Sequence, residues 1–181
     1  MRIFILIFFI LLTAVYSDNL DQKNKLDKLF KQLAKINNSK TAEQLEKKIW
    51  LIWNQHPNNL KLTDRLELGT ELMHYGNYDY ALEVFNNIIY TDPKWSEAWN
   101  KRATLFFLMK DYKSSLKDID KVLGLEARHF GALSGQARIY IKLEEYEKAI
   151  LSLKKALKFY PSFKSGELIP EIEKIIKEQI I

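Results

Sequence analysis

Three related stretches of sequence, repeated at a fixed interval, decide the fold of this chain. Residues 77–93 read NYDYALEVFNNIIYTDP, residues 111–127 read DYKSSLKDIDKVLGLEA, and residues 145–161 read EYEKAILSLKKALKFYP. One tyrosine in each stretch marks the interval: Tyr78, Tyr112 and Tyr146 are equally spaced along the chain. A constant 34-residue period is typical of a solenoid, in which one supersecondary unit stacks on the next.

The residue types also repeat in register with these tyrosines. Small residues recur at two positions of each unit: Gly69, Ala103 and Ala137, then Ala81, Ser115 and Ala149. Apolar residues recur at two more: Phe85, Ile119 and Leu153, then Ile88, Val122 and Ala156. We expect the small residues to let two antiparallel helices approach closely, and the apolar ones to fill the space between units. Leu68, Leu72 and Tyr75 are predicted to share the apolar face of the first helix.

This register resembles the tetratricopeptide repeat (TPR), whose 34-residue pattern places Leu-Gly, Tyr, Ala, Phe and Pro at fixed positions. The resemblance covers residues 62–163 as three repeats, and the middle one departs most, with Arg102, Ser115 and Ala127. It implies an all-α fold, a right-handed TPR solenoid of antiparallel helix pairs with capping helices at both ends. The sequences of residues 100–103 and 128–133 are similar to those of small exported bacterial TPR proteins.

The two flanks of the repeats are predicted to be caps. Residues 18–61 contain two amphipathic patterns, 20–36 and 42–53, which we interpret as a degenerate fourth helix pair forming an N-terminal cap. Residues 164–181 contain a third pattern from Pro170 onward, whose apolar face carries Ile172, Ile175, Ile176 and Ile180. A terminal helix with a polar outer face keeps an open solenoid end soluble.

Residues 1–17 have the layout of a secretory signal peptide. Arg2 supplies a positive charge, residues 3–14 are almost wholly apolar, and Ser17 is a small residue before Asp18. The alternative is a membrane anchor formed by residues 3–16, but a spanning helix needs about 20 apolar residues. We therefore predict cleavage after Ser17, a periplasmic or secreted mature protein, and no stable membrane span after cleavage.

Composition limits the remaining classes of function. Only 6 Gly and 4 Pro favour long helices over a many-stranded sheet. The net charge of +5 comes from 28 basic and 23 acidic residues that alternate along the predicted helices, which indicates a solvated surface and no nucleic-acid partner. Cysteine is absent, which excludes disulfides and cysteine-ligated metals.

The sequence contains no motif for catalysis or metal binding. The three histidines, His56, His74 and His129, lie far apart without zinc-site spacing, and we interpret them as ordinary surface residues. The run from Gly131 to Gly135 lacks the Lys-Ser/Thr of a phosphate loop, so its glycines are expected to allow close helix packing. We predict a protein that is not an enzyme and has no catalytic residues, cofactor or metal.

The resemblance implies a partner-binding groove lined by the first helix of each pair. The positions between the core residues are Leu66, Thr70, Met73, His74, Asn100, Lys101, Thr104, Phe107, Ser134, Arg138 and Ile141. Leu66 and Thr70 replace the first Lys/Asn pair of TPR grooves that grip a chaperone's C-terminal carboxylate, which argues against that specialised function. The sequence thus predicts an exported adaptor or assembly factor that binds a protein or peptide segment. The alternative is a structural subunit of a cell-envelope complex, which would self-associate when isolated.

Overall fold

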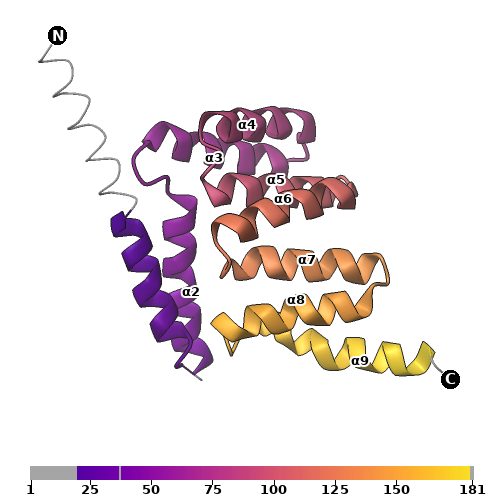
Figure 1. Ribbon diagram of the computed structural model, residues 1–181. Coiled ribbons are helices and arrows are strands. Elements are labelled where there is room, and N and C mark those ends of the chain that lie inside the picture. Colours follow the sequence, from indigo (N-terminus) through magenta and orange to yellow (C-terminus); the bar gives the residue numbers. More distant parts are fainter. Residues whose placement is uncertain (1–19, 37, 180–181) are drawn as a thin grey trace, which may run out of the picture.

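The computed structural model describes residues 20–36 and 38–179, and every regular element within these ranges is helical (Figure 1). A helical segment covers residues 20–33 and is followed by α2 (Ser39–Asn54), α3 (Leu60–His74), α4 (Tyr78–Thr91), α5 (Ser96–Leu108), α6 (Tyr112–Leu125), α7 (Phe130–Lys142), α8 (Tyr146–Phe159), the 3-10 turn η1 (Lys164–Glu167) and α9 (Leu168–Gln179). The predicted all-α solenoid of helix pairs is confirmed. The predicted signal peptide, residues 1–17, lies outside the described residues.

The turn inside each of three helix pairs repeats with the sequence period. Gly76, Lys110 and Glu144 adopt left-handed φ angles of 79°, 63° and 60° in the turns α3–α4, α5–α6 and α7–α8. In each turn the next residue donates its backbone N–H to a carbonyl five residues earlier, for example from Asn77 to Leu72 at 2.9 Å. This is the hydrogen bond of a Schellman cap, which ends one helix and reverses the chain. The three pairs then stack in order from α3 to α8 (Figure 1).

Small residues allow the two helices of a pair to pack closely, as the register predicts. Ala81 and Ala149 are fully buried. The hydroxyl of buried Ser115 donates to the carbonyl of Ala103 at 2.7 Å, so serine replaces alanine in the middle pair without leaving a polar group unpaired. At Gly69 a β-carbon would lie 2.6 Å from the Phe85 ring, which explains the glycine.

The unusual Arg102 of the middle repeat links two neighbouring pairs. Its guanidinium donates two hydrogen bonds, at 2.7 and 2.8 Å, to the carboxylate of Asp118, which is almost fully buried. A third bond, at 2.7 Å, reaches Asn86 on α4 of the preceding pair. A bidentate ion pair of this kind fixes the relative orientation of the two side chains and also balances their charges. Where the repeat usually packs leucine, this chain therefore uses a polar bridge.

The N-terminal helices do not stack on α3 as a fourth pair, in contrast to the expectation for residues 18–61. They lie across the ends of the solenoid helices instead, with α2 upright beside α5 to α8 (Figure 1). Their apolar residues share a core with α7 and α8 that contains Leu26, Phe30, Leu33, Ala42, Leu45, Ile49, Trp53, Phe130, Leu133, Ala156 and Tyr160. Polar contacts reinforce this docking, including the Arg128–Asp27 ion pair at 2.7 Å.

This arrangement also changes which residues of α3 are buried. Leu66, predicted to line the groove, is 1% exposed and packs in the core between α3, α4 and α5. Leu68 and Tyr75, predicted to be core residues, are 48% and 77% exposed. The reason is that, among the residues the structure describes, no helix pair stacks on the outer face of α3, where the register places Leu68.

The C-terminal helix packs against the last repeat. It begins at Leu168, two residues earlier than the sequence pattern indicated, and Pro170 is accommodated in its first turn, where no backbone donor is needed. Ile172 is buried among residues of α7 and α8, whereas Ile175 is 37% exposed. The outer face carries the charged residues of the helix.

Candidate functional site

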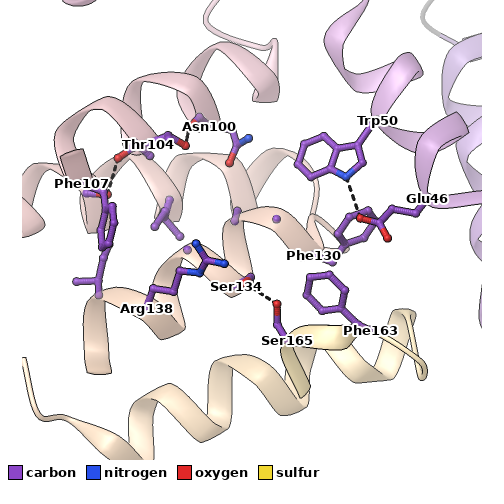
Figure 2. Close-up of a pocket in the computed structure, with 17 residues that line it drawn as sticks. Glu46, Trp50, Asn100, Thr104, Phe107, Phe130, Ser134, Arg138, Phe163 and Ser165 are labelled. Carbon is purple, nitrogen blue, oxygen red and sulfur yellow. Dashed lines mark hydrogen bonds between the residues drawn. The ribbon is translucent and has the colours of Figure 1, made fainter. Parts of the chain in front are cut away.

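A cavity of about 370 Å³ lies between α5 and α7, on the side of the solenoid formed by the first helices of the pairs. Figure 2 shows Asn100, Thr104 and Phe107 of α5 above it and Ser134 and Arg138 of α7 below it. Two further elements close one end: α2 contributes Glu46 and Trp50, and the segment between α8 and α9 contributes Phe163 and Ser165. The cavity therefore combines polar groups, aromatic rings and a guanidinium.

Arg138 is the cation of this cavity. Its side chain is exposed and extends from α7 toward the space between the helices (Figure 2). Within residues 20–36 and 38–179, the guanidinium makes no hydrogen bond or ion pair. Guanidinium groups present five donors in a planar fork that fits carboxylates and backbone carbonyls. Arg138 is thus available to bind an acceptor on another molecule.

The other polar groups of the cavity are held by internal hydrogen bonds. Asn100 donates its amide to Glu97 at 3.1 Å, and the hydroxyl of Thr104 donates to the backbone carbonyl of Asn100 at 3.0 Å. The Ser134 and Ser165 hydroxyls are 2.9 Å apart. These bonds fix the side chains in place, so the polar groups of the cavity are preorganised for a ligand.

The aromatic end of the cavity depends on close contact between α2 and α7. A β-carbon at Gly131 would lie 2.5 Å from the Trp50 ring, so glycine is required for this approach. The Trp50 ring meets the Phe130 ring edge-on, with centroids 5.5 Å apart. The predicted role of this glycine in close helix packing is confirmed, whereas at Gly135 the nearest atom would be 3.9 Å away, which is ordinary contact.

A buried hydrogen bond between a carboxylate and a histidine lies behind the cavity. Glu97 on α5 and His129, which caps the N-terminus of α7, are both 0% exposed, and the His129 Nε2–Glu97 Oε2 distance is 3.0 Å. His129 Nδ1 accepts the backbone N–H of Ala132 at 3.1 Å, which leaves Nε2 as the donor to Glu97. The His129 ring also stacks on Trp53 of α2 with centroids 4.0 Å apart.

These contacts control the ionisation of Glu97. Burial by itself would raise the pKa of this carboxyl group, but the hydrogen bond from His129 outweighs it, together with electrostatic attraction to His129 and Lys101 and the amide of Asn100. The pKa of Glu97 is consequently lowered from its ordinary value, and the group stays ionised in the core.

The buried histidines correct the interpretation of all three as surface residues. His129 is 0% and His56 is 5% exposed, and His56 Nε2 lies 2.9 Å from the carboxylate of Asp92. Only His74 is exposed. Both buried rings lie where the N-terminal helices meet the repeats, an interface that the 34-residue register does not contain.

The eleven predicted groove residues fall into three groups. Five line the cavity between α5 and α7: Asn100, Thr104, Phe107, Ser134 and Arg138. Leu66, Thr70 and Lys101 line an adjacent hollow of about 640 Å³ between α2, α3 and α5, although Leu66 is almost wholly buried. Met73 and Ile141 pack against core clusters, and His74 lies against Tyr75 on the surface. Asn100 and Ser134 are also more enclosed than a groove position implies, at 8% exposure each.

The cavity also uses residues that the sequence reasoning did not include. Glu46 and Trp50 come from α2, and Phe163 and Ser165 come from the segment between α8 and α9. The register assigns groove positions only within repeats, so it could not select them. The glycine at 131 was the one available signal, because it predicts that another element approaches α7 closely.

Comparison with known proteins agrees with this architecture. The tetratricopeptide-repeat family profile matches residues 130–163. A TPR repeat-containing protein of Rhizobium etli is 31% identical over 145 residues, covering 80% of this chain and 71% of that protein. The chain belongs to the TPR family.

Other relatives share only part of their length or only the fold. Mouse DnaJ homolog subfamily C member 3 is 32% identical over 104 residues, 58% of this chain but only 21% of that protein. The first TPR domain of Spaghetti (RPAP3), solved with a bound HSP90 peptide, superposes with a TM-score of 0.62 at 19% identity, covering 66% of this chain and 96% of that one.

Two further properties of the described residues bear on function. Across residues 20–36 and 38–179, no three His, Asp or Glu side chains gather in a way that could hold a metal ion. The helices described there include none that is both long and apolar enough to cross a membrane.

Proposed function

We propose that this TPR protein is an exported adaptor or assembly factor that binds a partner protein through the groove between α5 and α7. The observation that carries the proposal is Arg138, a cation without an internal partner among the described residues, at the mouth of a cavity of about 370 Å³. A role in stability does not explain the position of Arg138, since among the described residues it stabilises no other charged group. A ligand that supplies a hydrogen-bond acceptor would explain this position.

The chemistry of the walls favours a peptide segment over a small polar ligand. Phe107 offers apolar contact beside Arg138, and Thr104 and Asn100 present polar groups along one turn of α5. An extended peptide presents both side chains and backbone polar groups, which suits a groove lined by both apolar and polar groups. The fold neighbour RPAP3 binds a peptide of HSP90, which supports this use of the fold.

Export is supported by the sequence of residues 1–17. Their charged start, apolar run and small residue at position 17 have the layout that signal peptidases recognise. The partner would then be a protein of the periplasm or the exterior, and the mature chain would begin at Asp18. The mature N-terminus, read by sequencing or mass spectrometry, tests this part separately.

The binding proposal is tested by affinity. A partner captured from cell-envelope extracts would be titrated against the wild-type chain and Arg138→Ala, with Lys121→Ala on the exposed face of α6 as a control for loss of one positive charge. Loss of a charge-assisted hydrogen bond costs about 1.5–3 kcal/mol. We therefore expect Arg138→Ala to weaken binding at least tenfold and Lys121→Ala to leave it within twofold. Equal effects of both variants would place the binding surface elsewhere.

Asn100 is unsuitable for this test, although its position in the register suggests it. Its amide is 8% exposed and donates to the buried carboxylate of Glu97. Replacing it would remove one of the groups that stabilise a buried charge, so weaker binding could reflect a damaged fold.

A further inference from the structure

The closed end of the cavity has a different character from the end that holds Arg138. In Figure 2 the carboxylate of Glu46 lies between the rings of Trp50 and Phe163, with Phe130 behind them. The Glu46 oxygens accept the indole N–H of Trp50 at 3.2 Å and the hydroxyl of Tyr160 at 2.9 Å. The Phe163 and Phe130 ring centroids are 5.4 Å apart. One carboxylate is therefore surrounded by aromatic side chains.

The charge of Glu46 is not neutralised by these contacts. Both of its hydrogen-bond donors, an indole and a phenol, are uncharged. The nearby ammonium group of Lys164 is 2.8 Å from the carboxylate of Glu43, one turn earlier on α2, and is engaged there. Each carboxylate oxygen can accept more than one hydrogen bond, so Glu46 retains capacity for a further donor.

We infer that this end of the cavity is a subsite for a cationic side chain, a lysine or arginine of the partner segment. This inference rests on the proposed function and specifies the chemistry of the segment that binds. The carboxylate of Glu46 attracts the cation, and the negative faces of the Trp50 and Phe163 rings add a cation–π attraction, which arginine and lysine both use. A neutral or acidic side chain would gain neither contribution.

The position of the subsite relative to Arg138 predicts a spacing in the partner. Trp50 contacts α7 at Gly131, and Arg138 lies seven residues further along the same helix. Seven residues of α-helix rise about 10 Å, and an extended chain advances about 3.3 Å per residue. The partner segment therefore carries a basic residue at the Glu46 end and an acidic residue about three positions away, at the Arg138 end.

A random heptapeptide library displayed on phage tests this directly, with the purified full chain as the target. On the wild type we expect enrichment of peptides that pair Lys or Arg with Asp or Glu at this spacing. On Glu46→Gln the preference for the basic residue should disappear, whereas Glu173→Gln on α9, an exposed carboxylate outside the cavity, should preserve it. One enriched peptide should bind Glu46→Gln about five- to tenfold more weakly, the scale of one such contact.

A matched variant separates charge from structure. Tyr160→Phe removes a hydrogen bond to Glu46 but keeps its charge, so the basic preference should survive in this variant. If Tyr160→Phe abolishes the preference as fully as Glu46→Gln, the effect is structural and the inference is wrong.

The library also distinguishes this inference from the proposed function. Peptides that bind the wild type without any preference for a basic residue, and no longer bind Arg138→Ala, would overturn the cationic subsite but would still support binding in the groove. An absence of enrichment on the wild-type chain would count against groove binding itself, and the subsite would fall with it.

Discussion

The buried Glu97–His129 pair gives the sharpest test of how α5 is joined to the start of α7. In the variant His129→Phe the ring can still stack on Trp53, but Glu97 loses the Nε2 donor and Ala132 loses the acceptor that caps α7. Losing a hydrogen bond to a buried carboxylate costs about 1.5–3 kcal/mol, and only Lys101 and Asn100 remain as partners of Glu97. For a chain of this size that corresponds to a fall in Tm of roughly 3–12 °C.

The same variant should depend on pH in a defined direction. In the wild type the pKa of Glu97 lies below its ordinary value of 4.5, so its stabilising contribution is complete above about pH 4.5 and is lost as the pH falls through the lowered pKa. In His129→Phe the pKa of Glu97 should rise, because burial is then opposed only by Lys101 and Asn100, and protonation in acid relieves the cost of the buried charge. The stability difference between wild type and variant should therefore shrink between pH 7 and pH 4.

Urea unfolding followed by circular dichroism at both pH values measures this difference. The exposed His74→Phe serves as a control and should change the free energy of unfolding by no more than about 0.5 kcal/mol. The double variant Glu97→Leu/His129→Phe should recover much of the loss, because apolar replacement of a whole buried pair is often neutral. A loss below about 1 kcal/mol at pH 7, or the same loss at pH 4, would refute the reasoning.

Three further predictions concern packing and processing. Ala149→Leu should lower the free energy of unfolding by about 1–3 kcal/mol, since it overpacks a fully buried helix contact, and an unchanged Tm would mean that the repeat register is wrong. Gly131→Ala should also destabilise the chain, because its β-carbon would lie 2.5 Å from the Trp50 ring. Gly124→Ala in α6 should instead stabilise the chain by about 0.5–1 kcal/mol, because no atom lies within 4 Å of the added β-carbon. The melting temperatures of the two variants should therefore shift in opposite directions. Material isolated from the periplasm or medium should begin at Asp18, and an N-terminus at Met1 would contradict export by cleavage.

The repeat core could be predicted from the sequence because its physics is local and periodic. Small residues such as Ala81 and Ala149 are needed wherever two helices of a pair meet, so they recur with the repeat period and can be recognised without a structure. Residue type alone does not predict the turn conformation, as Gly76, Lys110 and Glu144 show. All three adopt the same left-handed conformation, yet only the first is glycine, because the surrounding cap hydrogen bonds stabilise the turn.

The position of the N-terminal helices could not be predicted in the same way. Residues such as Leu45 and Ile49 are compatible with a stacked fourth pair by periodicity alone, but their contacts are with Phe130 and Tyr160, far away in sequence. The amphipathic pattern shows that a helix has an apolar face and does not show what covers it. For the same reason, Glu46 and Trp50 were absent from the predicted groove, and the histidines at this interface were interpreted as exposed.

The central claim is that a partner protein occupies the groove between α5 and α7. Photo-crosslinking in the native cell tests it most directly, with a photoreactive amino acid placed at exposed Thr104 on the cavity wall or at exposed Lys121 on α6 outside the cavity. The groove account predicts a crosslinked partner at Thr104 that is absent at Lys121 and is lost when Arg138→Ala is added. A crosslink at Lys121 that is absent at Thr104 would contradict it.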